Sequence, residues 1–295
     1  MTLKLRFVQL DVFSTTRFLG NPLAVVHIPS GVTLSQSQKQ IIAREFNLSE
    51  TVFLHELADS DTPTTIDIFT TTEELPFAGH PTIGTGWYLL SQATQKDTVT
   101  LKTKAGVIPV IRNGGSVALQ VPINFREHAP FLHANLKATQ PHLDDKDYQN
   151  GKHGAEALAS IVKGMTFVLL ELTSEEALGR LQPFQMRITA PDLGDWAGFL
   201  GVYAFYERPD GVVRTRMFDG TLEDPATGSA ASTLAGWLAK KKGSGTWNFQ
   251  IVQGVEMGRK SEITVNVEID SSGEVSRIDL GGSAVEVMEG LICVE

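Results

Sequence analysis

Four short segments hold the polar side chains best suited to chemistry, and each lies where one predicted element gives way to another. The segments are 20–22, 47–51, 79–81 and 223–229. They combine carboxylates with a histidine and hydroxyls, which are the groups that move protons in enzymes. The sequence holds no nucleophile elbow, no H-E-x-x-H motif and no paired metal-ligand spacing, so acid/base chemistry is the first candidate.

Glu50 is the candidate base. It stands between a predicted helix at 35–46 and an apolar strand that starts at Thr51. A carboxylate at the mouth of a strand can be partly desolvated, which would raise its pKa toward a value useful for proton transfer. An ordinary loop glutamate fits the same spacing, and the spacing alone does not separate the two.

Three further candidates precede or begin helices. His80 can donate to a substrate carboxylate or shuttle a proton, and a capping or core-lining histidine is the alternative. Ser229 holds the corresponding place in the second half of the chain, where capping is the default role. Asp224 precedes Pro225 and can orient a substrate amine or hydroxyl, or close an Asx turn instead.

An internal repeat relates these segments to one another. Residues 69–80 align with residues 218–229 without a gap. The matched pairs are Phe69 with Phe218, Thr72 with Thr221, Glu74 with Glu223, Pro76 with Pro225 and Gly79 with Gly228. Both copies run from a strand through an acidic turn, a proline and a glycine into an apolar helix, which indicates a duplication.

Each copy places a glycine, Gly79 or Gly228, where a helix begins with free backbone N–H groups. Such a helix start favours a carboxylate or an oxyanion. Two such ends facing each other would form one anion-holding cleft. A dinucleotide-binding loop fits poorly, because Pro81 occupies the wrong position and no βαβ series follows.

Alternating strands and a few helices are expected to carry these segments. Strands are predicted at 3–13, 23–28, 51–57, 65–70, 98–102, 107–112, 117–121, 166–172, 201–207, 212–218, 248–253, 262–269 and 283–287. Helices are predicted at 35–46 with Ser35 as N-cap, 82–92, 175–181 and 230–241, the last ended by Gly243. Residues 127–154 lack periodicity and are expected to link the two halves.

Composition narrows the class of protein. The 295 residues favour two domains, and a formal net charge of −9 disfavours nucleic acid as a partner. No run of about 18 apolar residues is present and the start lacks signal-peptide features, so we expect a cytoplasmic protein that does not span a membrane. The single cysteine, Cys293, allows no intrachain disulfide, no cysteine-based zinc site and no racemase with two opposed thiols.

Taken together, the segments resemble those of the phenazine-biosynthesis (PhzF-like) family, which is related to diaminopimelate epimerase. The matching segments are 11–13, 20–26, 47–53, 69–84, 223–230, 253–259 and 281–287, in family order over nearly the whole chain. The resemblance implies an α+β fold of two similar domains, each a curved, mostly antiparallel sheet or barrel around a central helix. The expected domains are 1–124, completed by a strand near 285–295, and 125–284, related by a pseudo-twofold with the active site between them.

The resemblance also implies roles. Glu50 would remove a proton from one carbon of a small molecule and return it to another, with no metal and no cofactor. His80, Asp224 and Ser229 match the family's other active-site positions, while Asn21, Gly79, Thr227 and Gly228 are expected to bind substrate. A homodimer is implied as well.

The substrate is left open. Segments 127–154 and 217–222 depart from the family pattern where substrate shape could be set. The leading expectation is an isomerase that moves a proton on a small anionic, possibly cyclic, metabolite. An epimerase, tautomerase or hydratase of the same fold, or a protein that binds a small molecule without catalysis, are the alternatives.

Overall fold

The computed structural model describes residues 3–56, 63–93 and 95–294, and the chain divides into two units. Unit 1 comprises Met1–Gln120 and Gly281–Glu295, whereas unit 2 comprises Val121–Leu280. The C-terminal segment therefore returns to the first unit. Leu57, at the end of a predicted strand, lies outside the described residues.

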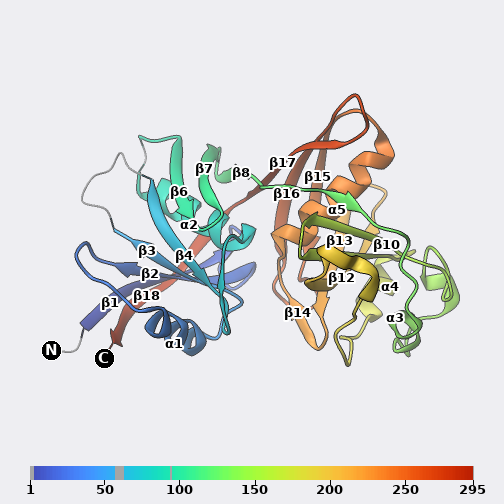
Figure 1. Cartoon of the computed structure of the whole chain (residues 1–295), viewed down its shortest axis with the longest axis horizontal. Helices are drawn as coiled ribbons and strands as arrows, with labels where there is room; N and C mark the ends of the chain where they lie inside the picture. The colour runs from blue at the N-terminus through green and yellow to red at the C-terminus, as the bar shows by residue number, and fades with distance from the viewer. Residues whose placement is uncertain (1–2, 57–62, 94, 295) are drawn as a thin grey trace. The chain divides into compact units, whose positions relative to one another are not determined.

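Unit 1 is a mostly antiparallel sheet with two helices (Figure 1). Its strands pair in the order β18–β1–β2–β3–β4–β6–β7–β8, with parallel pairing only for β2–β3 and β4–β6 in this run. The elements are β1 (Leu3–Val12), β2 (Asn21–Ile28), α1 (Gln36–Phe46), β3 (Thr51–His55), β4 (Thr64–Phe69), β5 (Glu74–Leu75), α2 (Gly79–Gln92), β6 (Thr98–Thr103), β7 (Gly106–Asn113), β8 (Ser116–Gln120) and β18 (Ala284–Val294).

Unit 2 repeats this arrangement. Its strands pair in the order β9–β10–β11–β12–β13–β15–β16, again with two parallel pairs, β11–β12 and β13–β15. The elements are β9 (Arg126–Glu127), α3 (Ala134–Ala138), η1 (Asp145–Asp147), β10 (Ala157–Val162), β11 (Met165–Glu171), α4 (Glu175–Arg180), η2 (Pro191–Trp196), β12 (Phe199–Glu207), β13 (Val212–Asp219), β14 (Leu222–Asp224), α5 (Gly228–Lys242), β15 (Gly245–Gln253), β16 (Ser261–Ile269) and β17 (Val275–Gly282), whose last residues belong to unit 1.

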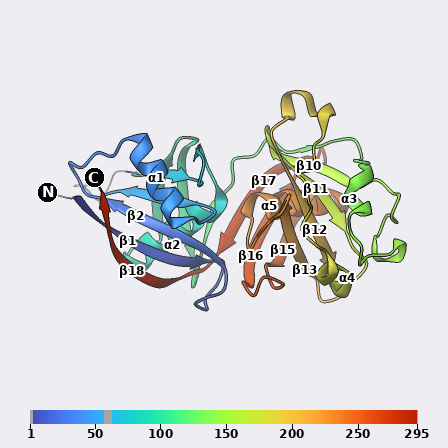
Figure 2. The ribbon, with the colours of Figure 1, turned by 90° about the horizontal axis from the view of Figure 1, so that it is seen from below.

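One central helix fills each unit. Helix α2 contacts strands on all sides of it, from β1, β2 and β3 to β6, β7, β8 and β18, and α5 contacts β10, β11, β12, β15 and β16 (Figures 1 and 2). Both helices are buried around most of their circumference, as their apolar and small residues require. Gly84 is needed for this closeness, because a Cβ there would lie 2.6 Å from the side chains of Leu23 and Val12. The expected fold class is confirmed.

The register confirms the repeat. Phe69 of β4 faces Glu74 of β5, and Phe218 of β13 faces Glu223 of β14 in the same antiparallel pairing. The central helices then begin at Gly79 and Gly228, the glycines that the sequence alignment had matched. Each copy also places a short outer helix, α1 or α4, between its first parallel pair of strands.

The predicted element bounds hold with small shifts. Ser35 caps α1 through a capping box with Gln38, and Gly243 ends α5 with a φ of 90°. Both central helices begin two or three residues before their predicted starts, since glycine, histidine and serine gave no apolar signal there. Strands β10 and β17 were missed, and β18 runs well beyond its predicted end.

The expectation that residues 127–154 link the two halves is wrong. Leu136, Leu143 and Tyr148 of this segment are buried in the core of unit 2. The Lys137 ammonium forms a buried ion pair with Glu156 and donates to the carbonyls of Gly151 and Gly154 at 2.6 and 2.9 Å. A buried ion pair and a few irregularly spaced apolar side chains hold the segment in place, which is why its sequence shows no periodicity.

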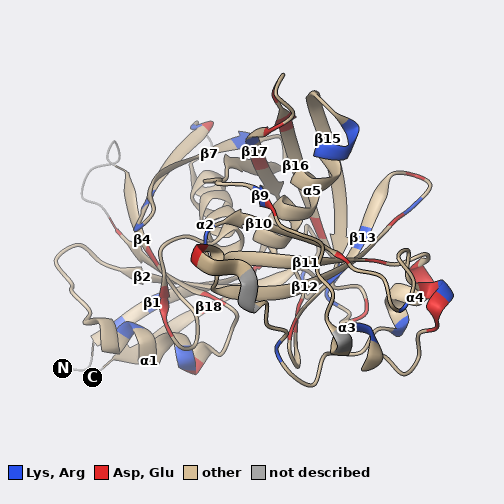
Figure 3. Ribbon diagram, turned by 45° about the vertical axis from the view of Figure 1, so that its right-hand side comes forward, with Lys and Arg blue, Asp and Glu red and all other residues tan. Residues whose placement is uncertain are grey.

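Lys and Arg (blue) and Asp and Glu (red) are scattered over strands, helices and loops of both units (Figure 3). Within residues 3–56, 63–93 and 95–294, no helix has the length and apolar content needed to cross a bilayer.

Candidate active site

Glu50 and His80 form a close pair in unit 1. Nδ1 of His80 lies 2.8 Å from Oε2 of Glu50, and the side chains are 4% and 18% exposed, respectively. Glu50 immediately precedes β3, whereas His80 is the second residue of α2. The structure therefore brings together the predicted base and the predicted histidine, while part of the Glu50 side chain remains exposed.

The second imidazole nitrogen fixes the protonation pattern of this pair. Nε2 of His80 lies 3.2 Å from the backbone carbonyl oxygen of Asn21, which can only accept. Nε2 must therefore carry a hydrogen. A neutral His80 then presents a bare Nδ1 to Glu50, and the hydrogen bond requires either a protonated Glu50 or a doubly protonated His80. In both cases the two side chains share one proton.

The pKa of Glu50 lies below its ordinary value. Burial pushes the pKa up, but the hydrogen bond from His80, the charge of His80 and a bond from Ser49 pull it down, and the downward contributions prevail. The expectation that desolvation would raise this pKa is wrong, because the sequence did not place a histidine against the carboxylate. Glu50 is thus held ionised near neutral pH, which is the form that accepts a proton.

Local backbone geometry positions both residues. Gly20 has a φ of +75°, and a Cβ there would lie 2.3 Å from the carbonyl oxygen of Val12, so only glycine fits before β2. Asn47 ends α1 in the left-handed conformation and turns the chain toward Glu50. The Phe13 ring lies 6.4 Å from the His80 ring and forms one wall beside it.

Asn21 is buried at the start of β2. Its carbonyl accepts from His80, and its side-chain Oδ1 accepts from the Ser49 hydroxyl at 3.3 Å. These contacts connect the segments around Gly20, Glu50 and His80, which the sequence had marked separately.

The start of α2 offers backbone donors. Its N-cap, Ala78, supplies no side-chain cap, and the first helical bond runs from the Thr82 amide to the Ala78 carbonyl at 3.3 Å. Pro81 has no N–H, so the amides of Gly79 and His80 are the donors that this turn presents. A helix start of this kind favours an anion.

Unit 2 gathers the other candidates around the start of α5. The Thr227 hydroxyl donates to Oδ2 of Asp224 in a short hydrogen bond. Thr227 is the N-cap of α5 and its carbonyl accepts from the Ala231 amide at 3.0 Å. Gly228 and the half-buried Ser229 form the first turn of the helix.

Gln253, at the end of β15, was not among the predicted site residues. Its fully buried amide contacts both Asp224 and Thr227. The sequence does contain one indication of it. Phe249, Ile251 and Gln253 are the inward-facing positions of an alternating strand, and a buried polar side chain needs a hydrogen-bond partner.

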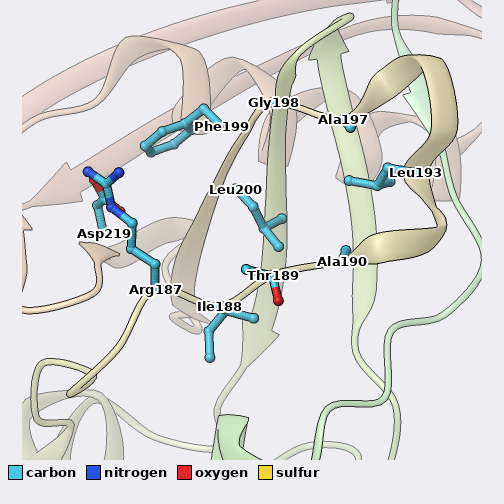
Figure 4. Close-up of a pocket in the computed structure, with 10 residues that line it drawn as sticks. All are labelled: Arg187, Ile188, Thr189, Ala190, Leu193, Ala197, Gly198, Phe199, Leu200 and Asp219. Atoms are coloured by element: carbon cyan, nitrogen blue, oxygen red, sulfur yellow. The ribbon is translucent and has the colours of Figure 1, made fainter.

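A small, mainly apolar cavity of about 230 Å³ also lies in unit 2 (Figure 4). Arg187 reaches toward Asp219 at one side of it, with a nitrogen–oxygen distance of 2.7 Å. Asp219 belongs to the segment 217–222, which the sequence had marked as a place where substrate shape could be set.

Each unit brings its own candidates together: Asn21, Glu50, Gly79 and His80 in unit 1, and Asp224, Thr227, Gly228 and Ser229 in unit 2. The expectation that one active site lies between the two units stays a prediction. Among the residues that the structure describes, no cluster of three or more histidine, cysteine or acidic side chains has the arrangement of a metal site.

Comparison with known proteins decides the family. A model of the phenazine biosynthesis-like protein family, PhzC-PhzF, matches residues 10–290. This chain belongs to that family. The resemblance inferred from the sequence motifs is thereby confirmed.

A curated relative shows the same extent of similarity. The trans-2,3-dihydro-3-hydroxyanthranilate isomerase of Pseudomonas aeruginosa is 35% identical over 97% of this chain and 98% of its own length. Curated relatives of this chain are named isomerases, and the chain is accordingly an enzyme of the isomerase class.

Solved structures agree on the fold. A PhzF-family protein from Bacillus anthracis has a TM-score of 0.81 at 21% identity, covering 98% of this chain and 99% of its own. A hydroxyproline epimerase from Agrobacterium vitis has a TM-score of 0.64 at 16% identity, covering 98% of this chain and 92% of its own. At these identities the likeness concerns the fold, and it confirms the epimerase-like architecture.

Proposed function

We propose that this isomerase moves a proton between two carbons of a small, cyclic carboxylate by general acid/base catalysis, with its own side chains and no cofactor. The observation that carries the proposal is the Glu50–His80 pair, in which the carboxylate of a partly exposed glutamate shares one proton with a buried imidazole. Such a pair can accept a proton and return it with no metal ion and no second protein.

The reaction balances within the substrate. Glu50 takes a proton from one carbon, the electrons of the broken C–H bond form a new double bond, and the electrons of the existing double bond move to a second carbon. Glu50 then delivers a proton, which can exchange with solvent while it is on the carboxyl group, to that second carbon, so the product differs only in the positions of one hydrogen and one double bond. His80, held by the Asn21 carbonyl, keeps Glu50 ionised before the first step. In the second step it stabilises the Glu50 carboxylate that forms again when the proton leaves.

The class of substrate is supported by the helix starts. The amides at Gly79 and His80, and those at the uncapped start of α5, suit a carboxylate or an enolate-like oxygen. We propose that Ser229 and Asp224 contact polar groups of the substrate. A dihydro-hydroxyanthranilate, the substrate in the name of the Pseudomonas relative, carries a carboxylate, an amine and a hydroxyl on one ring and is the first compound to test.

A chemical alternative is ruled out by the sequence itself. Epimerisation by two opposed thiols needs two cysteines, and this chain has only Cys293, which is exposed near the C-terminus. We also propose a homodimer, which the family resemblance implies and which light scattering coupled to size-exclusion chromatography would check.

The test is incubation with trans-2,3-dihydro-3-hydroxyanthranilate and a panel of small cyclic amino and hydroxy acids in D₂O. Mass spectrometry and NMR would report new double-bond isomers and their deuterium content. An isomer formed from any cyclic carboxylate supports the proposal. Binding of these compounds without isomer formation or label would contradict it and favour a protein that binds without catalysis.

A further inference from the structure

A buried hydrogen-bond network supports the Asp224–Thr227 turn from beneath. The amide of Gln253 makes four bonds: Oε1 accepts from the Thr227 N–H at 3.2 Å and from the Tyr203 hydroxyl at 3.0 Å. Nε2 donates to the Asp224 carbonyl at 2.7 Å and to the Thr227 hydroxyl oxygen at 3.1 Å. Tyr203 and Gln253 are fully buried, so these bonds replace water completely.

The donors and acceptors of this network can be assigned in only one way. The Thr227 N–H can only donate and the Asp224 carbonyl can only accept, so they fix which end of the Gln253 amide is oxygen. Because Nε2 of Gln253 donates to the Thr227 hydroxyl oxygen, the Thr227 hydroxyl hydrogen is free to point at Oδ2 of Asp224, where the short bond is seen. Tyr203, Gln253 and Thr227 therefore form a chain of donors that ends on the Asp224 carboxylate.

Unit 1 shows that the fold does not require this network. Phe218 of unit 2 corresponds to Phe69 of unit 1. From this pair, the registers of the neighbouring strands give the unit 1 equivalent of each residue in the network. The equivalents of Tyr203, Asp224, Thr227 and Gln253 are Val52, Leu75, Ala78 and Thr103, respectively. The same sheet and the same central helix thus form with apolar or short side chains at these four places.

Unit 2 in turn lacks the counterparts of two polar residues of the unit 1 site. The registers place Gly201 at the position of Glu50 and Met165 at that of Asn21, so the proton-sharing pair is confined to unit 1. Each copy of the repeated fold has specialised one helix start. In unit 2 the buried side chains of Tyr203 and Gln253 lead through Thr227 to Asp224, and a buried polar network that the repeated fold does not require points to function.

We propose that Gln253 and Tyr203 are positioning residues that hold the Asp224–Thr227 turn and orient the Asp224 carboxylate toward substrate. This inference rests on the proposed function, in which Asp224 contacts a polar group of the substrate. Displacement of a substrate-contacting group by about 1 Å can cost about 10²-fold in rate, so a support of this kind has a measurable effect.

The first test needs no substrate. Gln253→Met keeps the length and bulk of the side chain but removes every bond of the amide. Hydrogen exchange followed by NMR would show faster exchange of the Thr227 amide, by about tenfold or more. The Gly243 amide, which is bonded to Ala239 at the far end of α5, would keep its rate and show that the helix is intact.

The second test uses kinetics. Gln253→Met and Tyr203→Phe are each expected to lower kcat by about 10- to 100-fold with a smaller change in KM. The same substitutions made in an Asp224→Asn background should cause little further loss, since the residue that they position is already disabled.

Ser160→Ala is the matched control. Ser160 is fully buried in unit 2, and its hydroxyl contacts Thr166 and His128 at 2.6 and 2.7 Å, neither of which belongs to α5 or to the Asp224–Thr227 turn. Removal of this hydroxyl lowers stability as Tyr203→Phe does, but kcat is expected to stay within about twofold of the wild-type value.

Two results would overturn the proposal. One is an unchanged Thr227 amide in Gln253→Met, and the other is an equal loss of kcat with and without Asp224, which indicates a general structural effect. Full turnover in Asp224→Asn would instead contradict the proposed role of Asp224. The amide exchange separates that failure from a failure of the network.

Discussion

His80 and Glu50 share a single proton because the other imidazole nitrogen of His80 is committed to the Asn21 carbonyl. This arrangement gives the carboxylate a low pKa in a largely buried place, where desolvation alone would have raised it. The pair is therefore ready to accept a proton near neutral pH and has a neighbour that stabilises the charge.

The pH dependence of activity follows from this pair. Because the pKa of Glu50 lies below its ordinary value of 4.5, kcat should persist on the acid side and fall only as the pH drops through that lowered pKa. His80→Asn removes the imidazole charge, so burial prevails, the pKa of Glu50 rises and the acid limb moves to higher pH. A pH–rate profile of both proteins would measure the shift.

His27→Asn is the control for that profile. His27 is also buried in unit 1, and its Nδ1 lies 2.9 Å from Oε1 of Glu56, away from the candidate site. Its substitution should leave the acid limb in place. An acid limb that stays unchanged in His80→Asn would contradict the assigned role of His80.

Gly20→Ala tests the backbone that places Asn21. The new Cβ would lie 2.3 Å from the Val12 carbonyl oxygen in addition to the strain of a φ of +75°. Gly31→Ala is matched to it, since Gly31 has a φ of +83° with no atom within 4 Å of a new Cβ. Thermal or urea unfolding should show a loss of about 1 kcal/mol for Gly31→Ala and clearly more for Gly20→Ala. Equal losses would show that the contact with Val12 relaxes freely.

Lys137→Met tests the packing of residues 127–154. The substitution leaves the buried Glu156 carboxylate without its cation, which typically costs about 3–5 kcal/mol. Lys146→Met, at an exposed position of the same segment, should change the free energy of unfolding by less than about 0.5 kcal/mol. A small change in the free energy of unfolding in both variants would contradict the packing of residues 127–154 in unit 2 and favour a linker.

Much of the fold was readable because the signals are local. Ser35 and Gln38 form the capping box that starts α1, and the alternation of apolar residues sets most strands. The repeat around Phe69 and Phe218 was visible because proline and glycine mark the same turns in both copies. Strand β17 was not predicted, because Gly281 and Gly282 at its end interrupt the alternating pattern.

The site was readable only in part, because its chemistry depends on contacts between distant segments. Glu50 and His80 were identified as candidates, but their shared proton requires the carbonyl of Asn21, which no side-chain pattern reveals. Gln253 was missed because its partners, Tyr203 and Thr227, lie on two other elements. Periodicity reports which face of a strand is buried, whereas hydrogen-bond partners become known only when strands are placed in register.

Deuterium transfer by the wild-type enzyme and by Glu50→Gln is the most direct test of the central claim. Glu45→Gln, at an exposed position of α1, is the matched control. With a substrate that the wild type converts in D₂O, Glu50→Gln should fold normally and lose turnover and label incorporation by about 10²–10⁴-fold, while Glu45→Gln retains both. Conversion and labelling by Glu50→Gln at the wild-type rate would contradict the assignment of Glu50 as the base.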